Sequence, residues 1–129
     1  MDVLDTIKLW AENHYFDLKT RTEAKKLLAK DKHSERDECF GSLLEFGTGG
    51  LRGIMGVGTN RINLYTIQMA TDGVARIINK KTDVPNTSGV VIGYDSRHRS
   101  FEFAQMSSQV LAAHGIPVFL FRKIVPTPL

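Results

Sequence analysis

The sequence has few of the residues that cross-link a protein or anchor it in a membrane. A single cysteine, Cys39, excludes an internal disulfide, and no apolar run is long enough to span a bilayer. Seventeen basic and 14 acidic residues give a net charge of +3. These charges are spread along the chain and do not form the basic patch that is typical of proteins that bind nucleic acids or membranes. With no signal-peptide pattern either, the sequence predicts a cytoplasmic protein without nucleic-acid or membrane partners.

Candidate metal ligands and nucleophiles are also scarce. The four histidines lie far apart without metal-site spacing, and we interpret all of them as structural or exposed: His14, His33, His98 and His114. Cys39 can be read as a nucleophile or as a buried structural thiol. Because no triad-like partner pattern surrounds it, the sequence favours the structural thiol.

The first 42 residues read as a helical N-terminal lead. Residues 2–15 carry apolar side chains at helical spacing, Thr20 and Glu23 form a capping box for a helix over 20–28, and Ser34 is expected to cap a short third helix. The residues that this spacing places on one face of the first helix are Leu4, Ile7, Trp10 and Ala11.

Residues 43–129 alternate between strand and helix patterns. We expect strand, loop and strand over 43–62, a helix capped by Asn63, a strand over 89–94, a helix from Ser100 to Gly115, and a strand over 116–121. Gly73 is expected to lie close to the sheet. The residues expected to face the core from the two helices are Leu64, Ile67, Val74, Ile78, Phe103, Met106, Val110 and Leu111. The pattern predicts an α/β domain with a right-handed βαβ crossover and a three-layer α/β/α arrangement around a mixed, mainly parallel sheet.

The run Phe46-Gly47-Thr48-Gly49-Gly50-Leu51-Arg52-Gly53 is the strongest chemical signal. Its four glycines let backbone N–H groups converge on an oxyanion, and Arg52 can add a bidentate contact to a phosphate. The spacing matches neither a P-loop nor the dinucleotide-binding fingerprint. A Gly-rich hairpin with Arg52 on a surface carboxylate remains the alternative reading.

Three blocks together resemble the phosphohexomutase family, the phosphoglucomutases and phosphomannomutases. They are residues 45–61, then Gly93-Tyr94-Asp95-Ser96-Arg97, and then Pro126-Thr127-Pro128. The N-terminal lead and the Gly49-Gly50 pair are most similar to the branch of bacterial phosphoglucomutases and animal phosphoglucomutase-2-like or phosphopentomutase enzymes. The resemblance implies that residues 1–42 precede an α/β/α domain I at residues 43–129.

The family's phosphoserine loop would lie beyond Leu129, and its metal-binding and sugar-selecting loops are also missing here. The resemblance therefore implies an N-terminal fragment, inactive alone, of an isomerase that moves a phosphoryl group around a sugar through a phosphoserine and a bisphosphate. Mg²⁺ and glucose 1,6-bisphosphate would serve the full-length enzyme, with no cofactor in this chain alone. The expected partners are a phosphosugar and the remaining domains of the polypeptide.

The resemblance also assigns the site residues. Arg52 would contact the phosphoserine or the sugar phosphate, assisted by Thr48, Gly49 and Gly50, and Asp95 and Arg97 would support the active-site loops. For the last pair, a purely structural ion pair stays open. No catalytic residue or metal ligand is assigned within this chain.

Two other functions remain open, a free-standing phosphate-binding or regulatory module and a non-catalytic α/β interaction domain. The incomplete sheet predicts self-association through an exposed edge. The sequence does not select among glucose, mannose and pentose substrates.

Overall fold

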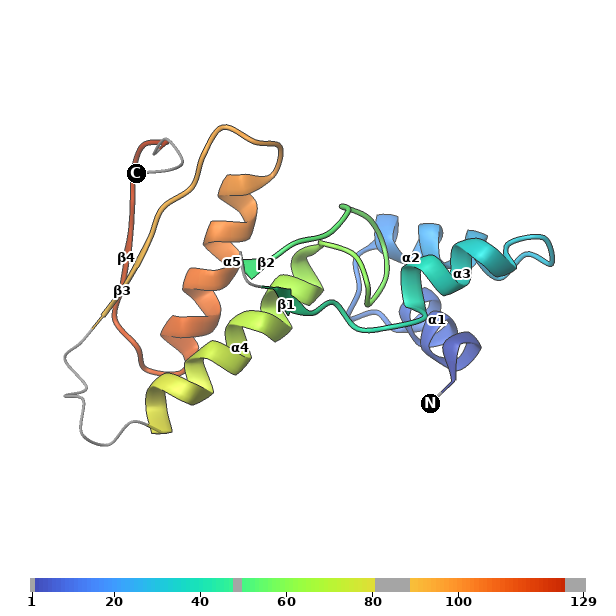
Figure 1. Cartoon of the computed structure of the whole chain (residues 1–129), viewed down its shortest axis with the longest axis horizontal. Coiled ribbons are helices and arrows are strands. Elements are labelled where there is room, and N and C mark those ends of the chain that lie inside the picture. Colours follow the sequence, from blue (N-terminus) through green and yellow to red (C-terminus); the bar gives the residue numbers. More distant parts are fainter. Residues whose placement is uncertain (1, 48–49, 81–88, 125–129) are drawn as a thin grey trace. The chain divides into compact units, whose positions relative to one another are not determined.

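The computed structural model describes residues 2–47, 50–80 and 89–124 (Figure 1). The chain divides into two compact units, residues 1–66 and 67–129. In order of sequence the elements are α1 (Val3–Glu12), α2 (Leu18–Lys26), α3 (His33–Phe40), β1 (Phe46–Gly47), β2 (Gly50–Leu51), α4 (Leu64–Lys80), β3 (Val90–Ile92), α5 (Ser100–Ala113) and β4 (Val118–Leu120).

The three helices of the N-terminal lead form as the sequence predicts, but two of them are capped differently. The helix α2 begins two residues before Thr20, and Asp17 caps it by accepting a hydrogen bond from the Thr20 backbone N–H at 2.8 Å. The predicted capping box is therefore wrong, because the carboxylate of Asp17 already satisfies that N–H. The helix α3 begins at His33 after Lys32, without a side-chain cap, so Ser34 lies within its first turn.

An aromatic core holds the first unit together. Trp10 stacks on Phe16 with ring centroids 4.5 Å apart and meets Phe40 and Tyr65 edge-on at 5.3 and 5.6 Å. Of the face predicted for α1, Ile7, Trp10 and Ala11 are buried, whereas Leu4 is exposed. Aromatic pairs at such distances add to the stabilisation from burial, so this small unit has a well-packed centre.

Tyr65, in the first turn of α4, is hydrogen-bonded to a residue 48 positions earlier. Its hydroxyl donates to Asp17 Oδ2 and accepts from the Asp17 backbone N–H, each at 2.9 Å. Burial alone would raise the pKa of Asp17, but the hydrogen bonds from Thr20 and Tyr65 outweigh it and lower that pKa. The start of α4 is thus fixed to the loop between α1 and α2.

The helix α4 begins where the sequence predicts, but its buried face is different. Asn63 Oδ1 accepts hydrogen bonds from the backbone N–H groups of Tyr65 and Thr66, both at 3.0 Å. Val74 is exposed, and the neighbouring Ala75 is fully buried instead. Gly73 is also exposed, and an added Cβ there would meet no atom within 4 Å, so its predicted packing against the sheet is wrong.

The second unit contains the predicted βαβ arrangement. β3 and β4 pair in parallel, with Val90 opposite Val118, Val91 opposite Phe119 and Ile92 opposite Leu120. The helix α5 connects them and ends before Gly115, whose φ is +77°. Ser100 is the first residue of α5 and not its cap, because Arg99 precedes the helix in the left-handed region. Of the residues predicted to face inward from α5, Leu111 is buried, and Phe103, Met106 and Val110 are half-buried.

Helices cover one face of this parallel pair. Ala75 of α4, Leu111 of α5 and Ile116 form the core, and half-buried side chains of both strands pack against it. On the other face, Val91 and Phe119 are 64% and 62% exposed. The fold class is α/β, as the sequence predicts, and one face of the parallel pair is uncovered by any described residue.

Candidate functional site

The Gly-rich turn folds back as a short hairpin. β1 and β2 pair antiparallel, with Phe46 opposite Leu51 and Gly47 opposite Gly50. Gly50 has a φ of +98°, a conformation that glycine adopts without strain. Thr48 and Gly49, two of the predicted phosphate contacts, lie outside the described residues. The strands are shorter than the sequence predicts, because only two residues of each are paired.

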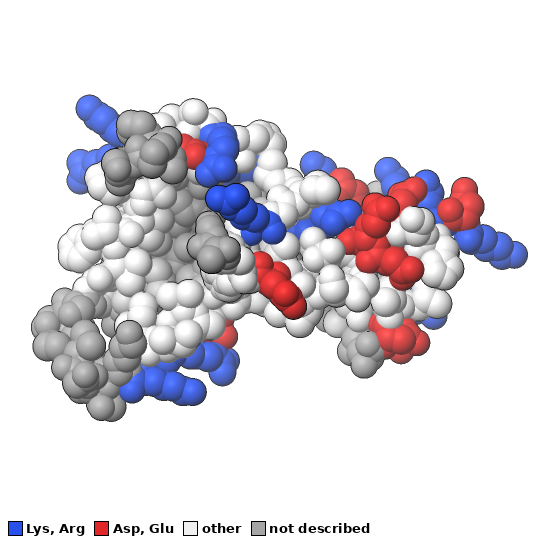
Figure 2. Space-filling model, in the orientation of Figure 1, with Lys and Arg blue, Asp and Glu red and all other residues white. Residues whose placement is uncertain are grey.

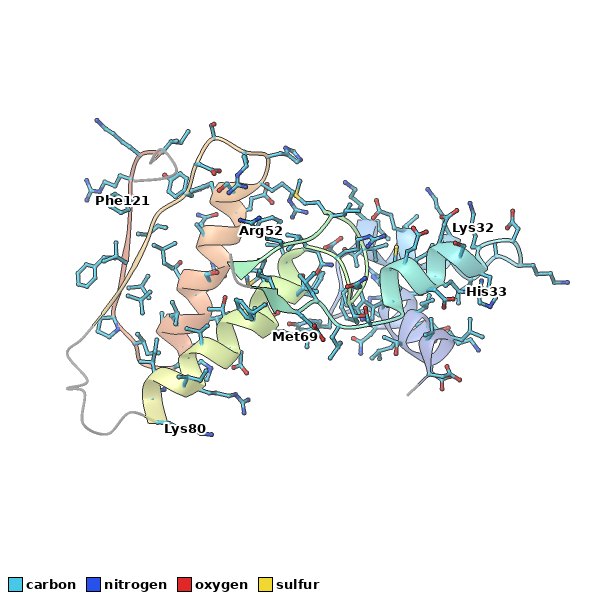
Figure 3. The ribbon with its side chains drawn as sticks, in the orientation of Figure 1. Lys32, His33, Arg52, Met69, Lys80 and Phe121 are labelled. Atoms are coloured by element: carbon cyan, nitrogen blue, oxygen red, sulfur yellow. The ribbon has the colours of Figure 1, made fainter. Side chains whose placement is uncertain are left out.

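Arg52 directly follows β2 and is exposed (Figure 3). Among the residues that the structure describes, no carboxylate forms an ion pair with it, and no hydrogen bond engages it. Of the alternative reading, the Gly-rich hairpin is present, whereas no surface carboxylate neutralises Arg52 in this part of the chain. A guanidinium without an internal partner is available for an external anion, and its planar shape suits phosphate oxygens.

The backbone beside Arg52 is held by close packing. A Cβ added to Gly53 would lie 2.8 Å from Leu44 Cδ1 and 3.6 Å from Ile62 Cγ1. Two hydrogen bonds then close the following loop, from Ile62 N–H to the Ile54 carbonyl at 2.8 Å and from Gly56 N–H to the Ile62 carbonyl at 3.1 Å. Gly53 thus lets the chain pass close to its neighbours directly after Arg52.

Asn63 has a second role that the sequence did not reveal. Besides capping α4, its side-chain amide donates to the carbonyls of Gly56 and Gly58, at 2.9 and 3.0 Å. One buried side chain therefore joins the loop that follows Arg52 to the start of a long helix. Such a link keeps the loop in one conformation, which is what a binding site for a small anion requires.

The same loop is fastened to the end of α3. Gly58, with a φ of +127°, lies so close to the Cys39 carbonyl that an added Cβ would be 2.8 Å from its carbon. Asn60 donates its backbone N–H to Cys39 at 2.9 Å and its side-chain amide to the Glu38 carbonyl at 3.0 Å. The helical lead therefore positions the loop that carries Arg52.

Cys39 belongs to this junction. Burial raises the pKa of its thiol, and the nearby Arg61 offsets only part of that effect. Arg61 is largely buried, and its Nη2 lies 3.7 Å from Glu38 Oε2. A thiol with a raised pKa carries little thiolate at neutral pH, in keeping with the structural role that the sequence favours.

The second group of predicted residues lies beyond the carboxyl end of β3. Asp95 accepts hydrogen bonds from the Arg97 backbone N–H at 3.1 Å and from Arg97 Nε at 2.7 Å. The hydrogen bond from the Arg97 backbone, together with its guanidinium, holds the pKa of Asp95 below its ordinary value. The Asp95 backbone N–H donates to Ser100 Oγ at 3.3 Å. The two predicted residues are thus in direct contact, as an ion pair that shapes the loop before α5.

A contact between a histidine and a carboxylate far away in the sequence was missed by the sequence analysis. His114 Nε2 lies 2.7 Å from Asp72 Oδ1, and Arg76 Nε contacts the other oxygen of that carboxylate at 2.8 Å. The hydrogen bond from His114, followed by that from Arg76, lowers the pKa of Asp72. The two partners are 42 residues apart, and no local spacing rule reports such a pair.

Neither a metal site nor a membrane segment is found in the described part of the chain. No three His, Cys, Asp or Glu side chains gather as metal ligands among residues 2–47, 50–80 and 89–124. Within the same residues, no helix is both long and apolar enough to cross a bilayer.

Comparison with known proteins identifies relatives. The family described as phosphoglucomutase/phosphomannomutase, alpha/beta/alpha domain I, matches residues 43–129. The phosphopentomutase of Homo sapiens is 38% identical over 115 residues, which cover 84% of this chain and 19% of that protein. The phosphoglucomutase of Staphylococcus aureus (strain USA300) is 46% identical over 94 residues, 73% of this chain and 16% of that protein. No solved structure matches significantly.

A bacterial phosphoglucomutase and an animal phosphopentomutase are the kinds of protein in the single branch that the sequence motifs indicated. The chain spans about a fifth of the length of the curated relatives that it matches. The family match begins at residue 43, ahead of the hairpin that carries Arg52, and continues through β3, α5 and β4. The chain belongs to the phosphoglucomutase/phosphomannomutase family, of which residues 43–129 match the α/β/α domain I.

Proposed function

We propose that this chain is the N-terminal part of a phosphosugar mutase and supplies a phosphate contact through Arg52. The observation that carries the proposal is the exposed Arg52 guanidinium, placed directly after a Gly-rich hairpin and without a described internal partner. The positive φ of Gly50 supports this function for the turn, because it turns the backbone within the hairpin.

The reaction we propose is an intramolecular phosphoryl transfer, between the 1- and 6-positions of a hexose or the 1- and 5-positions of a pentose. A phosphoserine and a bisphosphate intermediate would carry the phosphoryl group in a longer protein. Phosphoryl transfer depends mainly on positioning and on stabilising negative charge, and an arginine on a firmly packed backbone would contribute to both. Arg52 would contact the phosphoserine or the sugar phosphate.

Mg²⁺ and glucose 1,6-bisphosphate are proposed as requirements of the longer enzyme only. The described residues of this chain offer no group of three metal ligands, so we derive no step through a metal here. Asp95 and Arg97 are proposed as supporting residues, because their mutual hydrogen bonds shape the loop after β3 without leaving the carboxylate unpaired. We propose no general acid or base within this chain.

The test is mutase activity with glucose 1-phosphate, Mg²⁺ and a trace of glucose 1,6-bisphosphate. This chain is compared with a protein extended to the end of its open reading frame, and we expect activity only in the extended protein. In that protein Arg52→Ala should reduce kcat/KM roughly a hundredfold. This corresponds to a loss of about 3 kcal/mol of transition-state stabilisation, as for other charge-stabilising groups.

The control is Arg76→Ala, which removes an exposed arginine bound to a carboxylate on its own helix. We expect that variant to keep normal turnover. Equal turnover of Arg52→Ala and the unaltered enzyme would refute the role of Arg52.

Activity of the isolated chain would refute its proposed dependence on further domains. If the open reading frame ends at Leu129 and no activity is found, a non-catalytic phosphate-binding module becomes the better function.

We further propose that the isolated chain self-associates through the β3–β4 pair. Parallel sheets in soluble proteins are usually covered on both faces, whereas Val91 and Phe119 are largely exposed here. In a longer protein, the remaining domains of the same polypeptide would be the partners of this chain.

A further inference from the structure

The parallel pairing of β3 and β4 brings two loops to one edge of the second unit. Beyond the paired residues, the Phe121 backbone N–H donates to the Ile92 carbonyl at 3.0 Å, so the two strands leave the sheet side by side. The chain after β3 leads into α5, and the chain after β4 continues with Arg122 and Lys123. Ligands of open α/β sheets bind at such carboxyl edges.

The excess positive charge at this edge comes from β4 and not from β3. After β3, Arg97 pairs with Asp95 and Arg99 pairs with Glu102, at 2.7 and 3.1 Å. Arg122 and Lys123 are both exposed, and among the residues that the structure describes neither forms an ion pair. Figure 2 shows several lysine and arginine side chains at this end of the strands, with an acidic side chain among them.

The first turn of α5 follows the loop that leaves β3. α5 begins at Ser100, whose Oγ accepts a hydrogen bond from the Asp95 backbone N–H at this edge. The N-terminal end of a helix carries a partial positive charge. An arginine beside a lysine offers both a planar, multidentate donor and a mobile ammonium group, a combination that suits phosphate oxygens.

We infer that Arg122 and Lys123 form an anion-binding edge at the carboxyl ends of β3 and β4, and that its ligand is the phosphate group of a phosphomonoester. The assignment of that ligand as a phosphosugar rests on the proposed function, whereas binding of phosphate at this edge does not require Arg52. The edge is therefore a second anion contact, distinct in sequence and residues from the Gly-rich turn.

The test is a two-dimensional NMR titration of the 129-residue chain with inorganic phosphate, at constant ionic strength set with chloride. We expect saturable shifts of the backbone amides around 93–100 and 119–124. Arg122→Gln with Lys123→Gln should weaken the apparent affinity by roughly tenfold or more, because the double variant removes both charge-assisted contacts. The matched control is Lys25→Gln with Lys26→Gln, which removes two adjacent exposed charges from α2.

Two further variants separate folding from binding and this edge from Arg52. Arg122→Lys with Lys123→Arg keeps both positive charges and should bind phosphate as the unaltered chain does. If the glutamine variants lost binding only because substitution at these positions disturbs folding, this variant would lose binding too. Arg52→Ala should leave the shifts at this edge unchanged, even if it abolishes mutase activity in the longer protein.

Repeating the titration with glucose 1-phosphate and with glucose distinguishes the source of the phosphate. Tighter binding of glucose 1-phosphate than of inorganic phosphate would support a phosphosugar ligand, whereas equal affinity would support the edge as a site for free phosphate. The inference would be overturned if the Arg122/Lys123 and Lys25/Lys26 variants lost phosphate affinity equally, or if chloride alone gave identical shifts. It would also be overturned if Arg52→Ala abolished the shifts at this edge, or if phosphate caused no shift at all.

Discussion

Replacing Gly58 by alanine should destabilise the first unit. Gly58 is buried at the junction between α3 and the loop after Arg52, with a φ of +127°. An added Cβ would collide with the Cys39 carbonyl, which is backbone and cannot rotate away. The same carbonyl accepts the Asn60 backbone N–H at 2.9 Å, so moving it breaks that hydrogen bond.

The size of the effect follows from these two terms. Holding a residue with a side chain in a left-handed conformation costs about 1–3 kcal/mol. Losing the hydrogen bond to Cys39 costs about 1 kcal/mol more, for a total of roughly 3 kcal/mol. For a chain of this size we expect Tm to fall by roughly 10 °C.

The assay is thermal unfolding followed by the fluorescence of Trp10, the single tryptophan, which lies in the core of this unit. Gly73→Ala is the matched control, because Gly73 is exposed within α4 and has open space around it. That substitution should stabilise the helix by about 0.5–1 kcal/mol, measured by circular dichroism. If Gly58→Ala unfolds at the same temperature as the unaltered chain, close packing against Cys39 does not restrain this loop.

Three further predictions concern contacts far apart in the sequence. Tyr65→Phe removes both hydrogen bonds to Asp17 and, at this partly exposed position, should destabilise the first unit by about 1–2 kcal/mol in chemical unfolding. The control is Tyr94→Phe, which should be neutral because the Tyr94 hydroxyl has no described partner. Equal effects of the two variants would refute a stabilising contact between Tyr65 and Asp17. The lowered pKa of Asp72 stabilises the folded chain above the ordinary aspartate value of about 3.9, and this contribution is lost as pH falls through the lower, folded value. Asp72→Asn should therefore flatten the acid limb of a stability-against-pH curve, and an unchanged limb in this variant would contradict the contribution of the His114 contact. Phe119→Ser with Val91→Thr should reduce self-association in light scattering at several concentrations, and an unaltered chain that is monomeric throughout would refute the self-association.

The elements of this fold follow from local patterns, whereas several of their ends and faces do not. The apolar periodicity of α1 and α5 and the continuous apolar strands β3 and β4 were all visible in the sequence. The cap of α2 was misplaced, because Asp17 accepts the Thr20 backbone N–H that the capping box assigned to Glu23, and Asp17 gains a second partner in Tyr65. That partner is 48 residues away, and tertiary contacts of this kind decide between two local candidates.

The buried face of α4 shows the same limit in a different form. Spacing predicted Val74 as a core residue, although the structure buries Ala75 and leaves Val74 exposed. Beside Ala75, Thr71 Oγ1 lies 3.1 Å from Ser107 Oγ of α5, so small and polar residues of α4 face α5. A hydrophobic pattern cannot report a helix contact made by alanine, threonine and serine, because none of them is strongly apolar.

For the candidate site, the motif predicted the residue, but the structure explains what holds it. Arg52 was identified from glycines and a guanidinium in one turn, yet the support comes from Asn63 and from the end of α3, both outside that motif. Asn63 was visible in the sequence only as a helix cap. Its additional bonds to two loop carbonyls depend on a loop conformation that no short pattern encodes.

The two units differ in how completely they bury their apolar side chains, and the difference bears on function. The first unit closes an aromatic core around Trp10 and carries Arg52 on a loop with many internal hydrogen bonds. The second unit leaves one face of a parallel pair uncovered by any described residue. Since a site that contacts phosphate needs rigid support, the first unit has what the proposed role of Arg52 requires, whereas burial of Val91 and Phe119 on the β3–β4 pair would take a further partner.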